Sequence, residues 1–253
     1  MAKQVGPLLL EGSMNGINYY FLEGEALARR SGGGFTGEAI KKSPAMETVR
    51  KNDSEFGCCS KVNKQFKTAL RPFLAGYQDG TLHRRLMQMF LKIKNSDLIS
   101  EHGQRSVHQG ISAKCGQQLL QEFIFTPKRT HFLGCNYQFN WDTRALEVSE
   151  FTIKEARFPK NSHFMEIVVG LIRFDFESLA YEQVHAAPTV IARDFEGDSF
   201  EVRCNEIPDG EGILFAMVRI GFYQKVDGDG HLVGPPHSFG IAVASVWDDG
   251  EGE

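Results

Sequence analysis

The first 34 residues alternate short apolar runs with glycine-containing turns. Two strand-like runs, Pro7–Glu11 and Ile17–Leu22, flank a turn in which Asn15-Gly16 can take the left-handed backbone conformations of a tight hairpin. A second turn leads to a third candidate strand over Glu25–Arg30. A sheet this small is marginal by itself, because it buries too little apolar surface. We therefore predict an N-terminal β-hairpin arm over residues 1–34 that must bury one face elsewhere.

Between residues 35 and 120 the apolar positions recur every three or four residues, a spacing that is typical of helices. Ser43-Pro44 is a favourable helix start, and Arg71-Pro72 is a favourable end. The stripe expected along this helix consists of Met46, Val49, Asp53, Phe56, Ser60, Asn63, Phe66 and Leu70. A second helix is predicted over residues 82–93 and a third between Ser100 and Gln121. Together they form a basic helical region.

From residue 121 onward, runs rich in Phe, Val and Ile alternate with turn clusters. The expected strands are Gln121–Thr126, His131–Trp141, Ala145–Ile153, Phe164–Phe174, Ser199–Cys204, Ile213–Lys225 and Ser238–Trp247. Seven strands of this kind predict an antiparallel Ig-like β-sandwich over residues 121–247. Residues 248–253 form a short acidic tail. The whole chain is therefore expected to be an α+β protein.

Composition is that of an ordinary folded protein, since 42% of the 253 residues are hydrophobic. The leucines near the N-terminus are too few for a signal-peptide core, and no apolar run approaches the roughly 18–20 residues that cross a membrane. We expect a cytoplasmic protein with no membrane partner. Five cysteines without a CxxC pair predict reduced, buried thiols, and the adjacent Cys58 and Cys59 are expected to serve packing.

The two halves of the chain carry opposite charge. Residues 1–130 contain 19 Lys+Arg and 11 Asp+Glu, a balance of +8, and the remaining residues contain 9 and 21, a balance of −12. The sum is the net charge of −4. This asymmetry indicates either a basic half that meets an anionic partner or two halves that attract each other, within one chain or between copies.

No signature of catalysis or cofactor binding accompanies this charge pattern. The alternating aspartates of Asp227–His231 resemble the start of a calcium-binding loop. The flanking residues are strand-like and no glutamate closes the loop, so we predict a hairpin turn there. The eight histidines have no metal-ligand spacing, and neither GxSxG nor a phosphate-binding loop occurs. We therefore expect no metal, no cofactor and no catalytic residue, and predict that the protein is not an enzyme.

The first 75 residues carry several short motifs. They are Lys3-Gln4-Val5-Gly6, Leu10-Glu11-Gly12-Ser13, Gly16-Ile17, Ala28-Arg29, the segment 43–52, the segment 54–57 and the segment 67–71. With these motifs the chain resembles a family of bacterial proteins of the Bacteroidota. The resemblance implies an N-terminal hairpin, a basic helical segment and a β-rich C-terminal half. It implies no activity, so it gives no residue a catalytic role.

The leading functional hypothesis is a structural protein that self-assembles into a ring, tube, filament or virion-like layer. A hairpin with open edges can extend a neighbouring sheet, and the joint at Gly32–Gly34 would let it reach that neighbour. Opposite charges suit head-to-tail contacts, with Lys61, Lys64 and Lys67 facing an acidic copy. The residues expected to form the subunit contact are Leu8, Leu9, Leu10, Ile17, Tyr19, Tyr20 and Phe21.

Two alternatives stay open. The first is a nucleic-acid-associated protein of a phage or mobile element, although a pI near 6.1 and the lack of a binding motif do not favour it. Its basic surface would consist of Lys41, Lys42, Arg50, Lys51, Lys61, Lys64, Lys67, Arg71, Arg84 and Arg85. The second is a ligand- or sugar-binding module on the sandwich loops, which an exposed Trp141 or Tyr137 in a groove would favour.

Overall fold

The computed structural model describes residues 2–32, 36–129, 132–234 and 238–247. The chain divides into two compact units, Met1–Ser54 and Glu55–Glu253, and each is considered by itself. The acidic tail predicted over 248–253 and the joint predicted at Gly32–Gly34 lie wholly or mostly outside the described residues.

The N-terminal unit contains a four-stranded antiparallel sheet in the order β1-β4-β3-β2. Its strands are β1 (Ala2–Lys3), β2 (Gly12–Met14), β3 (Ile17–Leu22) and β4 (Glu25–Arg30). The tight turn at Asn15-Gly16 is confirmed, with φ of +50° and +73°. The strand predicted over Pro7–Glu11 is wrong, because β3 pairs instead with Gly12–Met14. Proline lacks the amide hydrogen that a ladder needs.

Helices follow the sheet. Thr36 caps α1 (Gly37–Lys42) by accepting a hydrogen bond from the amide of Ala39, and a short 3₁₀ turn (Pro44–Met46) precedes α2 (Glu47–Ala69). Sequence periodicity did not predict α1, which buries no residue. The start of the long helix near Ser43-Pro44 is confirmed.

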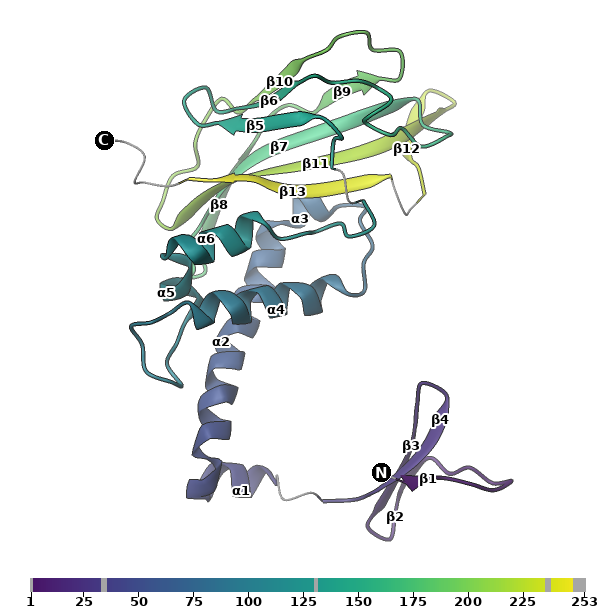
Figure 1. Ribbon diagram of the computed structural model, residues 1–253, viewed down its shortest axis with the longest axis vertical. Helices are drawn as coiled ribbons and strands as arrows, with labels where there is room; N and C mark the ends of the chain where they lie inside the picture. Colours follow the sequence, from purple (N-terminus) through teal and green to yellow (C-terminus); the bar gives the residue numbers. More distant parts are fainter. Residues whose placement is uncertain (1, 33–35, 130–131, 235–237, 248–253) are drawn as a thin grey trace. The chain divides into compact units, whose positions relative to one another are not determined.

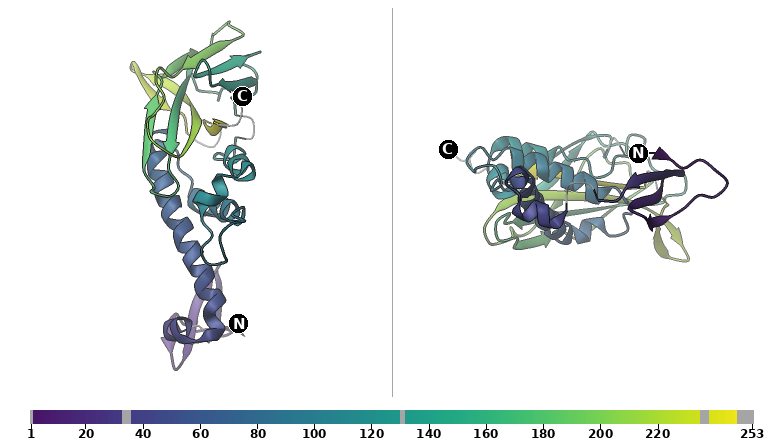
Figure 2. Two further views of the ribbon diagram at one scale, coloured as in Figure 1. Left: turned by 90° about the vertical axis from the view of Figure 1, so that its left-hand side faces the viewer. Right: turned by 90° about the horizontal axis from the view of Figure 1, so that it is seen from below.

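Helix α2 continues into the second unit, where four further helices follow it among the described residues. They are α3 (Arg71–Leu74), α4 (Leu82–Asn95), α5 (Val107–Ile111) and α6 (Lys114–Gln121). Figure 2 shows α4, α5 and α6 grouped beside α2. The stripe predicted for α2 is partly wrong, because Phe56 is 50% exposed while the neighbouring Glu55 is buried. The helix predicted over residues 82–93 is confirmed by α4.

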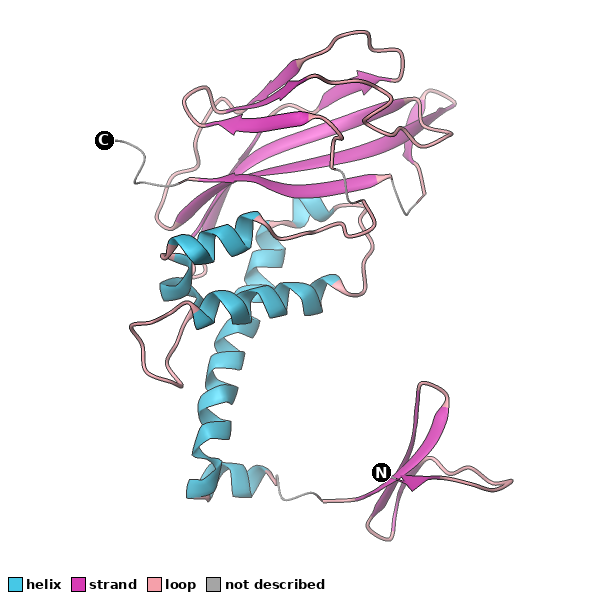
Figure 3. Cartoon of the chain, in the orientation of Figure 1, coloured by secondary structure: helices cyan, strands magenta, loops and turns pink. Residues whose placement is uncertain are grey.

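Two antiparallel sheets make up the rest of this unit (Figure 3). The small sheet has the order β10-β6-β5, formed by β5 (Asn136–Asn140), β6 (Ala145–Ser149) and β10 (Phe200–Arg203). The large sheet has the order β12-β11-β7-β8, with β13 also beside β11 and β9 also beside β7. Its strands are β7 (Phe164–Phe174), β8 (Tyr181–His185), β9 (Thr189–Ala192), β11 (Ile213–Val226), β12 (Asp229–Leu232) and β13 (Phe239–Val246).

The large sheet is the middle layer of the second unit, between the small sheet and the helices (Figure 1). Side chains alternate across a strand, so β7 faces both layers. Its Met165 and Ile167 join a core with Leu146 of the small sheet, whereas Ile172 and Phe174 join a core with the helices. Such burial on both faces explains why β11 reads as an almost continuous apolar run.

The α+β class is therefore confirmed. The strand predicted over Phe164–Phe174 matches β7, and the turn at Asp227-Gly228 joins β11 to β12 as predicted. The strand predicted over Gln121–Thr126 is wrong, because α6 ends at Gln121 and the residues after it form no strand. Strands β8 and β9 were not predicted from the sequence.

Candidate functional site

In the N-terminal unit, most of the predicted basic residues are engaged locally. Lys42 pairs with Glu38 at 2.8 Å and Lys51 with Glu47 at 2.9 Å, each across one helical turn. Arg50 donates from Nη1 to the carbonyl oxygens of Ile40 and Ser43, at 2.5 and 2.9 Å. These interactions stabilise the helical start. Lys41 is exposed on α1 and has no ion pair with a described residue.

In the second unit, four of the predicted basic residues line one groove of about 580 Å³. The lining consists of Ser60, Lys61, Lys64, Lys67, Thr68, Arg71 and His83. Residues spaced by three and four positions share a helix face, so Lys61, Lys64 and Lys67 point to one side of α2. The opposite side is apolar and buried, with Val62 and Phe66 in the core. Burial of one face thus places the cations on the other.

The charge of this groove is not compensated within the described part of the chain. Elsewhere, Lys94 and Arg105 both bind Glu55, at 2.5 and 2.8 Å. In contrast, no ion pair of the described residues involves Lys61, Lys64, Lys67 or Arg71. The groove is therefore a preformed positive surface that can receive an anion.

His83 adds a hydrogen-bonding group from α4. The buried Asn63 donates from Nδ2 to the His83 carbonyl oxygen at 3.0 Å and lies 3.3 Å from its Nδ1. Thr68 donates its hydroxyl hydrogen to the carbonyl oxygen of Lys64 at 3.1 Å, so its oxygen can only accept a further hydrogen bond. Besides its charges, the groove therefore offers polar groups on Ser60, Thr68 and the exposed His83 ring.

The two remaining basic residues do not line the groove. Arg85 pairs with Asp79 at 2.6 Å and donates to the carbonyl oxygens of Ile124 and Phe125. It anchors the segment after α6 rather than facing a ligand. Arg84 is exposed on α4, next to His83 in sequence but outside the lining.

The structure divides the predicted assembly residues among three places in the N-terminal sheet. Ile17, Tyr19 and Phe21 share one face of β3, and Tyr20 lies on the other, where Arg29 covers its ring at 5.5 Å. Leu8, Leu9 and Leu10 belong to the segment between β1 and β2 rather than to a strand. Leu8 is 77% exposed, and the Leu10 backbone is held by the side chain of Gln4.

The face with Ile17 and Phe21 is mainly apolar. The register places Met14, Ala26 and Ala28 on it as well, and Arg30 lies at its end, opposite Ile17. Met14, Ile17 and Phe21 are 53%, 37% and 45% exposed. Among the described residues of this sheet, Leu27 alone is buried, and it lies on the opposite face. We call Met14, Ile17, Tyr19, Phe21, Ala26 and Ala28 the apolar face. Met14 was not predicted as part of it, because the partner strand of β3 was expected at Pro7–Glu11 and lies instead at Gly12–Met14.

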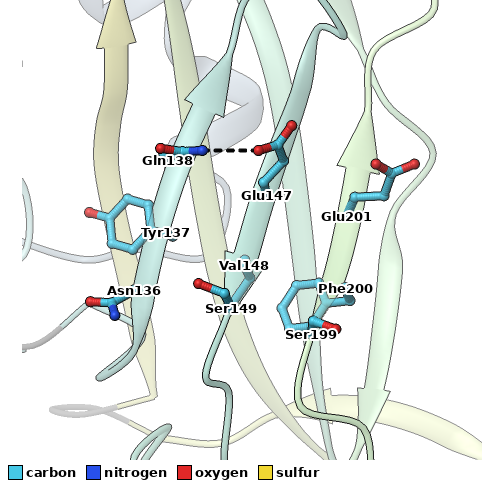
Figure 4. A pocket seen from close by; sticks show the side chains of 9 residues that line it. All are labelled: Asn136, Tyr137, Gln138, Glu147, Val148, Ser149, Ser199, Phe200 and Glu201. Carbon is cyan, nitrogen blue, oxygen red and sulfur yellow. Dashed lines mark hydrogen bonds between the residues drawn. The ribbon is translucent and has the colours of Figure 1, made fainter.

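A polar hollow of about 510 Å³ lies over the small sheet (Figure 4). Glu147 accepts hydrogen bonds there from Gln138 at 3.0 Å and from Asn140 at 2.9 Å, and these donors lower the pKa of its carboxyl group. Half-buried Tyr137 lines the hollow, but Trp141 does not. The Trp141 indole donates to Ser245 Oγ and packs against Phe139. The exposed tryptophan that would favour a sugar site is therefore missing from this hollow.

Other candidate chemistry is limited. Among the described residues, no group of three or more His, Cys, Asp or Glu side chains is placed to hold a metal. No described helix combines the length and apolar character needed to cross a bilayer. All five thiols are free, as predicted, but the prediction that they are buried is wrong for Cys58 and Cys115, which are exposed. Burial raises the pKa of Cys59 to about 11.

No family model, curated protein or solved structure matches the chain. The resemblance over the first 75 residues therefore stays a prediction, and the apolar face and the basic groove are the two surfaces that bear on function.

Proposed function

We propose that this protein is a non-enzymatic structural subunit that self-assembles through its N-terminal sheet. The observation that carries the proposal is the apolar face, whose Met14, Ile17 and Phe21 remain about half exposed. A small sheet needs a covered hydrophobic face to be stable, and this one has only Leu27 buried. Packing of the apolar face against a second copy supplies that cover.

The energy of this contact is moderate. Fully burying a side chain such as Ile, Met or Phe stabilises by about 1.5–3 kcal/mol, so covering the exposed halves of three such residues contributes about 3 kcal/mol per sheet. Association itself costs an estimated 4–15 kcal/mol, so two facing sheets alone give at most a weak dimer. Further contacts between copies are needed for a stable assembly.

Charge supplies a second, directional contact. The basic groove on α2 has no ion-pair partner among the described residues, while residues 131–253 carry a net charge of −12 (9 Lys+Arg against 21 Asp+Glu). A positive surface on one copy facing a negative surface on the next is a heterologous contact, which closes into a ring or continues as a filament or layer. In this proposal the second unit is an Ig-like sandwich with helices on one sheet, which forms the body of the subunit.

Sedimentation velocity on two matched variants tests the role of the apolar face. Phe21→Asp places a charge on that face, and Leu22→Asp places one on the opposite face of the same strand, where the native side chain is 54% exposed. We expect the first variant to sediment as a monomer and the second to keep the wild-type oligomer. Equal behaviour of the two variants would contradict the proposal.

A nucleic-acid-associated function is the second candidate, and the groove cations favour it. In that case nucleic-acid phosphates would bind the groove cations in place of the carboxylates of a neighbouring copy. The affinity for nucleic acid would then fall steeply as the salt concentration rises. Fluorescence anisotropy with single-stranded and double-stranded oligonucleotides of mixed sequence discriminates between the candidates. No binding at 20 mM salt, at roughly micromolar protein where non-specific binding is detectable, would remove this candidate.

A further inference from the structure

We propose that the basic groove receives the acidic segment 248–253 of a second copy of this chain. The segment reads Asp-Asp-Gly-Glu-Gly-Glu and lies outside the described residues. This inference rests on the proposed self-assembly, and it names the two surfaces that meet in the charged contact. The groove supplies the cations Lys61, Lys64, Lys67 and Arg71.

The spacing of charges on the two sides is compatible. Alternate residues of an extended chain face the same way about 6.7 Å apart, so Asp249, Glu251 and Glu253 would present carboxylates over about 13 Å. Lys61 and Lys67 are six positions apart on α2, which corresponds to about 9 Å of helix at 1.5 Å per residue, and Arg71 follows in α3. Long lysine side chains adjust to the remaining difference. The two glycines of the segment leave room for a close approach to α2.

The position at which the described chain ends favours a second copy as the donor. Trp247 donates its amide hydrogen to the Leu214 carbonyl oxygen, and its ring packs against Trp141 of the small-sheet layer, 5.2 Å between centroids. The groove lies on the side of α2 opposite its buried Val62 and Phe66. In Figure 1, β13 ends on the left while α4, which carries His83, begins on the right.

Six residues reach at most about 20 Å when fully extended. A segment of the same chain has to pass around the helical layer to meet the groove, so fewer of its carboxylates can pair there. The segment of a neighbouring copy can enter the groove directly. The contact is then head-to-tail, an arrangement that the opposite charges of the two halves favour.

Zero-length cross-linking of an isotopically mixed sample tests this contact. Equal amounts of unlabelled and ¹⁵N-labelled full-length protein are combined and treated with a carbodiimide, which joins a lysine amine to a carboxylate in contact with it. We expect peptides that join Lys61, Lys64 or Lys67 to segment 248–253 and contain one labelled and one unlabelled partner. Cross-links only between partners of the same label would show that the segment binds its own chain, and would overturn the proposal, as would their absence.

Peptide binding separates this inference from the proposed assembly through the apolar face. The receptor is full-length protein in which the segment is neutralised by Asp248→Asn, Asp249→Asn, Glu251→Gln and Glu253→Gln, together with Phe21→Asp. A fluorescent peptide of sequence 247–253 should bind it at low salt and be released by salt. A second outcome concerns the single variant Phe21→Asp, whose acidic segment is intact. If the peptide binds the receptor but this single variant keeps the wild-type oligomer, only the proposed role of the apolar face is wrong.

Matched variants locate the binding. We expect Lys64→Gln with Lys67→Gln to weaken peptide binding about fivefold, because each exposed ion pair contributes modestly. Arg84→Gln with Lys92→Gln, which removes two exposed cations of α4 outside the groove, should leave affinity unchanged. Equal loss in both pairs, or binding of an Asn/Gln peptide as tight as that of the acidic one, would overturn the proposal. Binding of an oligonucleotide but not of the peptide would instead favour a phosphate polymer.

Discussion

Replacing Glu55 by glutamine should strongly destabilise the second unit. The carboxylate is 2% exposed and accepts hydrogen bonds from Arg105 Nε at 2.8 Å, Lys94 Nζ at 2.5 Å and the amide of Gly103 at 2.7 Å. It therefore holds the segment between α4 and α5 against α2. Glutamine keeps the shape of the side chain but removes the negative charge that Lys94 and Arg105 share, and Lys94 is buried.

The magnitude follows from two independent estimates. Hydrogen bonds from Arg105, together with those from Lys94 and Gly103, lower the pKa of Glu55 from 4.5 to about 2 despite its burial. At 1.36 kcal/mol per pKa unit, this shift corresponds to about 3 kcal/mol of stability at neutral pH. Removing one partner of a buried ion pair costs about 3–5 kcal/mol in measured cases. We therefore expect a loss of about 3–4 kcal/mol.

Urea unfolding followed by tryptophan fluorescence measures this loss, because both tryptophans, Trp141 and Trp247, belong to the second unit. Glu101→Gln is the matched control, since Glu101 is exposed in the same connecting segment. The control should change the free energy of unfolding by less than about 0.5 kcal/mol. A loss of unfolding free energy below about 1 kcal/mol for Glu55→Gln would refute the claim that the charge of Glu55 holds the segment between α4 and α5 against α2.

The ionised Glu55 carboxylate also makes the stability of the second unit depend on pH. Because the folded-state pKa lies below the ordinary value, the carboxylate stabilises the fold fully above about pH 4.5, and this contribution is lost as the pH falls from about 4.5 towards 2. The wild type should therefore lose stability over this range more steeply than Glu55→Gln does. Parallel profiles for the two proteins would contradict the reasoning.

Two other predictions concern packing and thiols. Gly57→Ala should stabilise α2 by about 0.5–1 kcal/mol, because nothing lies within 4 Å of the added methyl group. Gly110→Ala should destabilise the second unit by more than about 2 kcal/mol, because its methyl group would lie 1.9 Å from the Ile93 carbonyl oxygen. Thermal unfolding of the Gly57→Ala and Gly110→Ala variants measures both effects. A thiol reagent should modify Cys58 and Cys115 rapidly in the folded protein and the other three only slowly, and five equal rates would contradict the described burial.

Much of the fold was predictable from the local pattern of apolar and polar residues, and the predictions that failed did so for physical reasons. Strand β7 was predicted with its correct bounds because β-branched residues and a long apolar run identify a buried strand. Strand β8 was missed because its Tyr181–His185 sequence is polar and partly exposed at the edge of the sheet. Burial of Glu55 was missed because its partners lie 39 and 50 residues away, and Phe56 offered a more apolar choice.

The candidate site was predictable in part. Helical spacing alone groups Lys61, Lys64 and Lys67, so the positive side of α2 follows from the sequence. His83 comes from α4, and only tertiary packing places it in the same groove. The apolar face depended on register, because pairing β3 with Gly12–Met14 brings Met14 beside Ile17. Two local signals favour this pairing over the one expected with Pro7–Glu11: the two-residue turn at Asn15-Gly16, and the missing amide hydrogen of Pro7.

Self-assembly is the central claim, and light scattering tests it most directly. The molar mass of the wild-type protein is measured at low salt over a range of concentrations after size-exclusion chromatography. We predict a mass well above the 28.4 kDa of one chain, rising with concentration and falling when salt is added. A single species of 28.4 kDa at high concentration and low salt would contradict the account.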